Sequence, residues 1–109
     1  MLNQIVMVGR LVKDIELKEG ENGRKYANLS LAIPRSFKNA EGEYETDFVN
    51  CTAFDNIATN TAEYCRKGDI IGVKGRIQSS TIEENETKKY VLEIIAEKVT
   101  FLSDSKREG

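Results

Sequence analysis

A two-residue alternation of apolar and polar side chains constrains the fold of this chain more than any other feature of its sequence. The alternation is strict between residues 26 and 34. Its apolar set is Ala27, Leu29, Leu31 and Ile33, and its polar set is Asn28 and Ser30. Successive side chains of a β-strand point to opposite faces, so this pattern predicts a strand with one buried face. Pro34 cannot donate a backbone hydrogen bond, and we expect it to help end the pairing of this strand.

Four more segments are predicted strands, at about residues 5–12, 44–54, 69–78 and 90–102. Gly9 interrupts the first of them and predicts a bulge or a bend there. In the second, Phe48, Asn50, Thr52 and Phe54 share one face, and Val49, Cys51 and Ala53 share the other.

Three polar stretches separate the predicted strands. Residues 20–23 and 39–42 both contain glycine and are predicted to form a turn and a hairpin loop. Residues 79–87 contain neither Gly nor Pro, and their acidic, polar composition predicts a long hairpin loop.

Between the strands at 44–54 and 69–78 the period changes to that of a helix, predicted from about Asn56 to Arg66. Asp55 is its predicted N-cap, and Gly68 is a suitable residue with which to leave it. Arg66 and Lys67 suit the negative end of the helix dipole. The predicted apolar side consists of Ile57, Ala58, Ala62 and either Tyr64 or Cys65.

The resulting order is three strands, one helix and two strands. An all-β, five-stranded OB-fold barrel has this order, with its helix between strands three and four. A bent first strand also suits a closed barrel, because one strand must then serve both sheets. A β-grasp fold and an open β-sandwich with an added helix remain alternatives. We expect one domain at residues 1–102 and a polar, disordered end at residues 103–109.

The composition argues against an enzyme. The chain has no His among its 109 residues, which excludes a His general base and a His-ligated zinc site. Two Cys cannot close a zinc tetrahedron, and the segment Gly72-Val73-Lys74-Gly75 is too short for a phosphate-binding P-loop. We therefore expect no catalytic residues, no metal and no cofactor.

The sequence also gives no sign of membrane insertion or secretion. No charge-free stretch approaches the ~20 residues of a membrane span, and the first ten residues lack the features of a secretory signal. The expected protein is soluble and cytoplasmic, without a membrane partner. Cys51 is then expected to be a reduced core residue, because the cytosol disfavours disulfides.

Four acidic residues alternate with other residues as the chain enters the strand at 44–54: Glu41, Glu43, Glu45 and Asp47. On one face of a strand they could attract a divalent cation. The simpler interpretation is a solvated edge that discourages the addition of another strand.

Three phenylalanines lie in polar surroundings: Phe37, Phe48 and Phe54. Every nucleobase has an apolar face, and stacking on an aromatic ring contributes roughly 1–3 kcal/mol per base without demanding a sequence. The three rings are therefore candidates for a base-stacking surface. The alternative is that they close an end of the barrel or an oligomer contact.

The charge balance permits nucleic-acid binding but does not indicate it. Sixteen Lys and Arg against eighteen Asp and Glu give a formal net charge of −2. A ligand in a groove experiences mainly the charges that line that groove. The cations near the groove therefore determine whether it can bind an anion. Six basic side chains are candidates for a phosphate-contacting track: Arg10, Arg35, Lys38, Arg76, Lys88 and Lys89. The alternative for each is an ordinary solvated surface charge.

Several short motifs occur together in a fixed order. They are Met1-Leu2-Asn3, Val8-Gly9-Arg10-Leu11, Arg35-Ser36-Phe37, Asp47-Phe48-Val49-Asn50-Cys51, Ala62-Glu63-Tyr64 with Lys67-Gly68, and Gly75-Arg76-Ile77-Gln78. With this order and spacing, the chain from residue 1 to about 102 resembles the bacterial single-stranded DNA-binding protein family. The resemblance implies an OB-fold barrel, assembled as a homotetramer around which single-stranded DNA wraps.

The resemblance also implies roles for individual residues. Three of the family's four base-stacking positions fall on Phe37, Phe48 and Phe54, whereas the fourth falls near Ile82, which has no ring. Positions that are often basic in the family are occupied here by Ser79, Ser80, Thr81, Asp55 and Asn56. These departures imply fewer stacking and phosphate contacts, and hence weaker binding or a smaller site.

The family commonly carries a C-terminal extension with an acidic tip that recruits partner proteins. The sequence here ends in Lys106-Arg107-Glu108-Gly109. Either the chain is trimmed, or it resembles a short paralogue of the phage, plasmid or competence-associated kind. We favour the short paralogue and expect tail-mediated protein partners to be absent.

These observations predict a non-enzymatic protein that binds and protects single-stranded DNA without sequence preference, in replication, recombination, repair or DNA uptake. The rival hypothesis is an OB-fold protein-interaction module of a replication or primosome complex that touches DNA weakly. Ile82, Asp55 and the negative net charge favour this rival. RNA binding as a cold-shock-like domain is disfavoured, because the sequence has no compact aromatic RNA motif.

Overall fold

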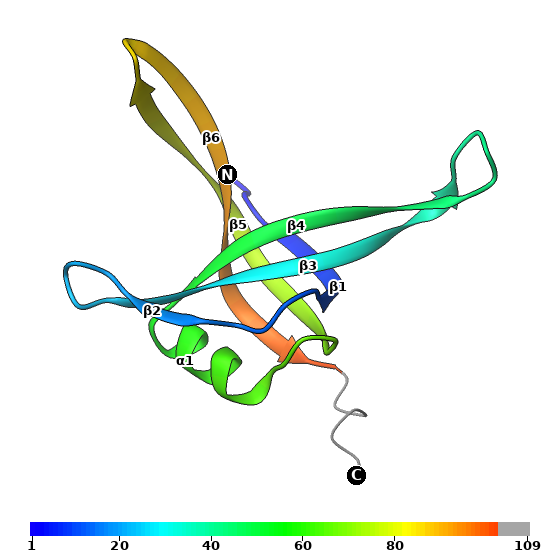
Figure 1. The fold of residues 1–109 in the computed structure, drawn as a ribbon, viewed down its shortest axis with the longest axis horizontal. Helices are drawn as coiled ribbons and strands as arrows, with labels where there is room; N and C mark the ends of the chain where they lie inside the picture. The colour runs from blue at the N-terminus through cyan, green and yellow to red at the C-terminus, as the bar shows by residue number, and fades with distance from the viewer. Residues whose placement is uncertain (103–109) are drawn as a thin grey trace.

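Six strands and one helix make up the part of the chain that the computed structural model describes, residues 1–102 (Figure 1). In chain order they are β1 (Ile5–Leu11), β2 (Leu17–Glu19), β3 (Lys25–Lys38), β4 (Tyr44–Phe54), α1 (Asp55–Tyr64), β5 (Ile70–Glu84) and β6 (Thr87–Phe101). The disordered end predicted at residues 103–109, and with it the predicted lack of an acidic tip, lies outside the described residues.

Five of the strands close into a barrel. The hydrogen-bonded order is β1-β5-β6-β4-β3, and β3 pairs again with β1, so the sheet returns to its first strand. All neighbours are antiparallel except β4 and β6, which are parallel at Cys51↔Ile94. The predicted five-stranded barrel is confirmed, and the β-grasp and the open sandwich are excluded. The sixth strand, β2, pairs with β3 and was not predicted, since its three residues are too few to show a period.

The core is formed by the inner rows of the barrel strands and by the buried side of α1. Its largest fully buried side chains are Leu11, Leu29, Leu31, Ile71, Val73, Thr61 and Cys51. In β3 the apolar row of the alternation is buried at Ala27, Leu29 and Leu31, but Ser30 of the polar row is buried as well. Cys51 is a free thiol, as predicted, and its S–H donates to the carbonyl oxygen of Leu29 at 3.8 Å. Burial raises the pKa of this thiol to about 11.

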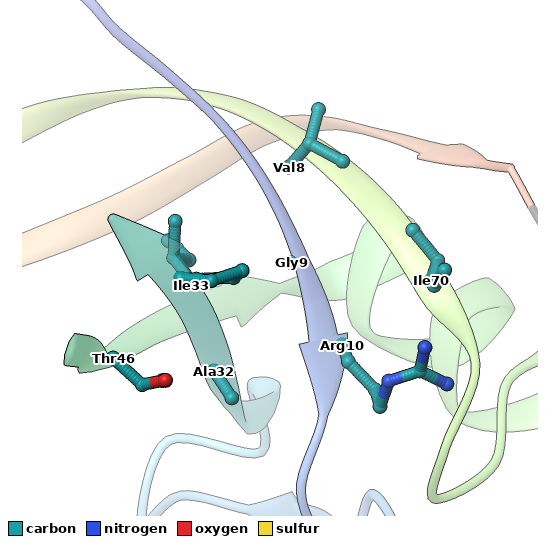
Figure 2. A pocket seen from close by; sticks show the side chains of 8 residues that line it. Val8, Gly9, Arg10, Ala32, Ile33, Thr46 and Ile70 are labelled. Carbon is teal, nitrogen blue, oxygen red and sulfur yellow. The ribbon is translucent and has the colours of Figure 1, made fainter. Parts of the chain in front are cut away.

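Gly9 allows β1 to pass close to β3. The register of β1 with β5 runs without a shift from Ile5 to Arg10, so there is no bulge at Gly9. A Cβ atom on this glycine would lie 2.9 Å from Cγ1 of Ile33 and 3.0 Å from the carbonyl oxygen of Ala32. Figure 2 shows Gly9 on β1, with Ala32 and Ile33 on one side and Ile70 on the other. The missing side chain thus lets β1 pair with both neighbours and close the barrel.

The register irregularity of the β5–β6 ladder lies at Gly75 instead. The pairing shifts between Lys74 and Gly75, and a Cβ atom on Gly75 would overlap the carbonyl oxygen of Ile95. The absence of a side chain allows β6 to approach at this point, where its buried residues Ile95 and Ala96 enter the barrel.

The sequence suggested that pairing of this strand ends at Pro34, but strand β3 continues to pair beyond it. Pro34 still lies opposite Thr46, and after an irregularity the ladder resumes at Lys38↔Tyr44. A proline is tolerated where its position needs no ladder donor, so it interrupts this pair without ending it. The two strands therefore extend beyond the barrel as a projecting hairpin (Figure 1).

The prediction of a polar loop at residues 79–87 is also wrong. Strands β5 and β6 continue pairing up to Glu84↔Thr87 and turn through Asn85 and Glu86, whose φ angles are 49° and 65°. Two successive positive φ angles suit the twist of a tight hairpin. The sequence did not indicate this turn because the turn contains no glycine. It did not indicate the flanking strand residues because both of their faces are exposed, which leaves no alternation of apolar and polar side chains.

The helix begins one residue earlier than predicted and ends two residues earlier. Asp55 is its first residue, with φ 55°, and makes no side-chain cap hydrogen bond, so its predicted N-cap role is wrong. The helix ends at Tyr64, so Arg66 and Lys67 lie beyond its last turn, which contains no basic residue. The buried residues of the helix are Ala58 and Thr61.

The contact at Gly75 gives a test of the fold. Gly75→Ala should lower the free energy of unfolding by about 1–3 kcal/mol, because the new methyl group forces β6 away from β5. Gly20→Ala is a matched control, since its Cβ would come no closer than 3.4 Å to any neighbour. Its effect should stay within about 0.5 kcal/mol in urea unfolding. Equal stabilities of the two variants would contradict the register shift described here.

Candidate nucleic-acid interface

The outer surface of β3 and β4 forms a continuous strip, which we call the β3–β4 face. Its cross-strand pairs, from one end to the other, are Tyr26↔Phe54, Asn28↔Thr52, Ser30↔Asn50 and Ala32↔Phe48. The two middle pairs are joined by hydrogen bonds, with Ser30 Oγ 2.7 Å from Asn50 Oδ1 and Thr52 Oγ1 3.4 Å from Asn28 Oδ1. The face is therefore polar in its centre and aromatic at both ends.

Two of the three predicted stacking rings are open to solvent. The side chain of Phe48 is 73% exposed on the β3–β4 face, and that of Phe37 is 66% exposed on the projecting end of β3. Neither ring closes the barrel, because neither belongs to the core. Each presents a flat apolar surface of the kind that stacks on a nucleobase.

The third ring, Phe54, is half-buried and has two partners. The Tyr26 ring lies 6.5 Å away, centroid to centroid, at 45°. The guanidinium carbon of Arg24 lies 4.2 Å from the centroid of Phe54. The ring is thus on the outer face, as the alternation predicted, but it is partly covered by a cation that the sequence did not single out.

Arg35 is held by carboxylates. Its Nη2 and Nε lie 2.9 and 3.2 Å from Asp47 Oδ1, and its Nη1 lies 3.4 Å from Glu45 Oε2. The hydrogen bond from Arg35 is the main cause that lowers the pKa of Asp47, and the same bond raises the pKa of the guanidinium. Asp47 lies opposite Ile33, whose row faces the core, so this ion pair lies on the reverse of the β3–β4 face.

The same contact involves two of the four acids of the alternating row. Glu45 and Asp47 bind an arginine instead of lying bare, and no cluster of potential metal ligands occurs within residues 1–102.

Arg10 and Arg76 lie on neighbouring strands of the barrel. Arg10 pairs in register with Ala32, and its Nη1 donates to the carbonyl oxygen of Gly68 at 2.8 Å. Arg76 on β5 donates from Nη1 to Gln78 at 2.8 Å, and its Nε lies 3.5 Å from Glu97. Both cations are exposed enough to meet an anion, but Arg76 already has a carboxylate beside it.

The three lysines lie toward the ends of the two projecting hairpins. The Nζ atom of Lys38 lies 5.7 Å from the ring centroid of Tyr44. Lys88 and Lys89 follow the β5–β6 turn, where Lys88 lies opposite Glu83. In Figure 1 the two hairpins project from the barrel in different directions, so the predicted residues do not form one compact cluster. We use the word path for the route along both hairpins and the barrel between them, on which these candidate residues lie.

Sequence reasoning missed four residues near this path: Arg24, Tyr26, Tyr44 and Tyr90. Tyr90 is 79% exposed on the β5–β6 hairpin, close to Ile82, where the resemblance placed a missing ring. The alternation along residues 90–102 gave no signal for this ring, since Tyr90 shares its row with the apolar Leu92 and Ile94, a pattern that predicts burial. Nothing local in the sequence signals the contact of Arg24 with Phe54, because these residues meet only through the fold.

A groove of about 490 Å³ runs between β1 and β3, with apolar walls that include Val8, Ile33 and Ile70 (Figure 2). Arg10 lines the same groove.

The described part of the chain contains no helix long and apolar enough to cross a membrane.

Comparison with known proteins assigns the family. The model of the single-strand binding protein family matches residues 2–102. This chain belongs to that family. Within the single-strand binding protein family, it is 48% identical over 109 residues to "Single-stranded DNA-binding protein B" of Bacillus subtilis (strain 168). That alignment covers 99% of this chain and 96% of the relative.

Other relatives are longer than this chain. It is 47% identical over 103 residues to a "Single-stranded DNA-binding protein" of Halalkalibacterium halodurans, covering 94% of this chain but 61% of that relative. A crystal structure of a deletion mutant of the single-stranded DNA binding protein from Thermus aquaticus superposes with a TM-score of 0.80 at 23% identity. The match covers 97% of this chain and 53% of the other, and it supports the barrel fold.

The Arg35–Asp47 contact predicts a pH dependence. Arg35→Gln should raise the pKa of Asp47 toward its ordinary value of 3.8, because the hydrogen bond that lowers it is lost. Since the folded-state pKa of Asp47 is depressed, the pair stabilises the protein fully above pH 3.8. This contribution disappears as the pH falls through the lower folded value.

Carbon-13 NMR titration of the Asp47 carboxyl, with urea unfolding at pH 6 and pH 2.5, measures both effects. An Asp47 pKa that is the same in wild type and Arg35→Gln would show that the ion pair does not form in solution.

Proposed function

We propose that this chain binds and protects single-stranded DNA without sequence preference, with bases stacking along the β3–β4 face. The observation that carries the proposal is the exposure of Phe48 and Phe37 on a barrel of this family. Leaving a phenyl ring in water forgoes roughly 1.5–3 kcal/mol of burial free energy. A ligand with apolar faces recovers that free energy when it binds, and unpaired nucleobases have such faces.

In this proposal, phosphate contacts contribute less to the affinity than base stacking does. Lys38, Lys88 and Lys89 form no ion pair with any residue from 1 to 102, whereas Arg35 and Arg76 lie beside carboxylates. Each phosphate contact contributes about −0.7 to the dependence of log affinity on log salt for single strands. The salt dependence should therefore be shallower than that of a relative with more basic residues.

The proposed activity is binding and not catalysis, and it serves processes that expose single strands. We assign the protein to replication, recombination, repair or DNA uptake in the cytoplasm. The relatives named above are single-stranded DNA-binding proteins, which supports this assignment.

We also propose that the protein forms a homo-oligomer, as a tetramer. Val6 and Val8 are exposed in a row on the outer face of β1, beside the apolar groove between β1 and β3. Burying these side chains against a second copy removes apolar surface from water. Mass determination in solution tests this assembly.

A second candidate function is a protein-interaction module with weak DNA contact. It is favoured by the pairing of Arg35 with Asp47 and by the partial covering of Phe54. Fluorescence-anisotropy titration with oligo-dT at low and moderate salt separates the two functions. Saturable binding that weakens as salt rises supports single-strand binding, and no binding at low salt supports the interaction module.

Phe48 gives the sharpest single-residue test of the proposed function. Phe48→Ala should weaken oligo-dT binding roughly five- to 150-fold, which corresponds to about 1–3 kcal/mol of lost stacking. Thermal unfolding should change little, since the ring is exposed and makes no core contact.

The matched control is Phe101→Ala. This phenylalanine is also exposed, but it lies 6.0 Å from the Tyr64 ring, beside the helix and not on the β3–β4 face. Its loss should leave the affinity unchanged. Equal affinities of wild type and Phe48→Ala would show that this ring does not stack on DNA.

A further inference from the structure

Arg24 places a cation at the Phe54 end of the β3–β4 face. Its guanidinium carbon lies 4.2 Å from the ring centroid of Phe54, close enough for a cation–π contact. Phe54 in turn contacts Tyr26, so the cation lies over an aromatic pair. A positive charge at this position can reach the backbone of a strand whose bases stack on the face.

Asp55 occupies the polar edge of the same guanidinium. Arg24 Nε lies 3.2 Å from Oδ2 and 3.4 Å from Oδ1, and Arg24 Nη2 lies 3.2 Å from Oδ2. Asp55 is the residue between β4 and the body of α1, with φ 55°. Its carboxylate therefore uses the donors that a phosphate would otherwise take.

The backbone of Arg24 is fixed by the turn that precedes β3. Its N–H donates to Asn22 Oδ1 at 3.0 Å, and its carbonyl oxygen accepts from the N–H of Gly20 at 2.8 Å. Gly23, with φ 81°, supplies the left-handed residue of this turn. The turn presents the arginine next to Phe54 in the absence of DNA.

The Arg24–Asp55 pair is open to solvent. The side chains are 51% and 59% exposed, so water screens their attraction and a phosphate can reach the guanidinium. Carboxylate and phosphate both match the planar donor fork of arginine. A phosphate can therefore replace the Asp55 carboxylate on Arg24. This replacement leaves the Asp55 carboxylate unpaired beside the DNA backbone.

We propose that Arg24 contacts a DNA phosphate and that its ion pair with the Asp55 carboxylate competes with this contact. The proposal rests on the proposed single-strand binding function and adds a residue pair that sets its strength. In the wild type, DNA gains the Arg24 contact only by breaking the ion pair. Asp55 therefore weakens binding and flattens its salt dependence.

Asp55→Asn tests the proposal with little structural change, because asparagine keeps the shape of the side chain and tolerates a positive φ. Oligo-dT binding is measured by fluorescence anisotropy at 50 and 200 mM salt. The variant should bind more tightly than wild type, with a salt slope steeper by about 0.7. Its advantage over wild type should shrink about 2.5-fold between the two salt concentrations.

The double variant Arg24→Ala/Asp55→Asn isolates the pair from a general charge effect. Against Arg24→Ala alone, it should show no added steepening, because no guanidinium is left to release. Glu21→Gln is a second control, since this exposed acid lies in the same turn and makes no ion pair with any residue from 1 to 102. It should leave the slope at its wild-type value.

Two results overturn the inference while the proposed function stands. They are an unchanged slope in Asp55→Asn and an equal steepening with and without Arg24, in each case with wild type binding oligo-dT. Absence of binding by wild type and by every variant overturns both the inference and the proposed function.

Discussion

The antiparallel pairing of β3 with β4 is the interaction on which both the core and the candidate binding surface depend. The register that places Leu29 opposite Cys51 inside the barrel also places Ala32 opposite Phe48 outside it. Because side chains alternate along a strand, a slip by one residue would exchange the two faces. The burial of the inner row thus holds the outer row in place, and Phe48 stays exposed without making a stabilising contact of its own.

The ion pairs around the barrel indicate why phosphate contacts are the smaller part of the proposed DNA binding by a chain with a net charge of −2. Arg24, Arg35 and Arg76 each lie within 3.5 Å of a carboxylate, so much of the positive charge is neutralised locally. Stacking on aromatic rings does not depend on charge, whereas phosphate contacts weaken as salt rises. In this account the bases supply most of the affinity and the remaining cations guide the backbone.

The sequence predicted the barrel because burial of one face leaves a period of two, as in residues 26–34 and 44–54. It placed Phe48 and Phe54 on the outer face for the same reason. It did not predict the β5–β6 ladder beyond residue 78, where both faces are exposed and no apolar period arises. Nor did it predict the Arg24–Asp55 and Arg35–Asp47 pairs, because these contacts depend on which strands become neighbours and in what register.

The central claim is that exposed phenyl rings of β3 and β4 stack on unpaired bases. The chain has four phenylalanines, and one of them, Phe101, lies away from the proposed path. Carbon-13 labelling of phenylalanine therefore gives a compact NMR experiment with a built-in reference. On addition of oligo-dT, we predict intermolecular nuclear Overhauser effects from the rings of Phe37, Phe48 and Phe54 to thymine protons, and none from Phe101. Saturating DNA binding with no such effect at Phe48 would contradict the account.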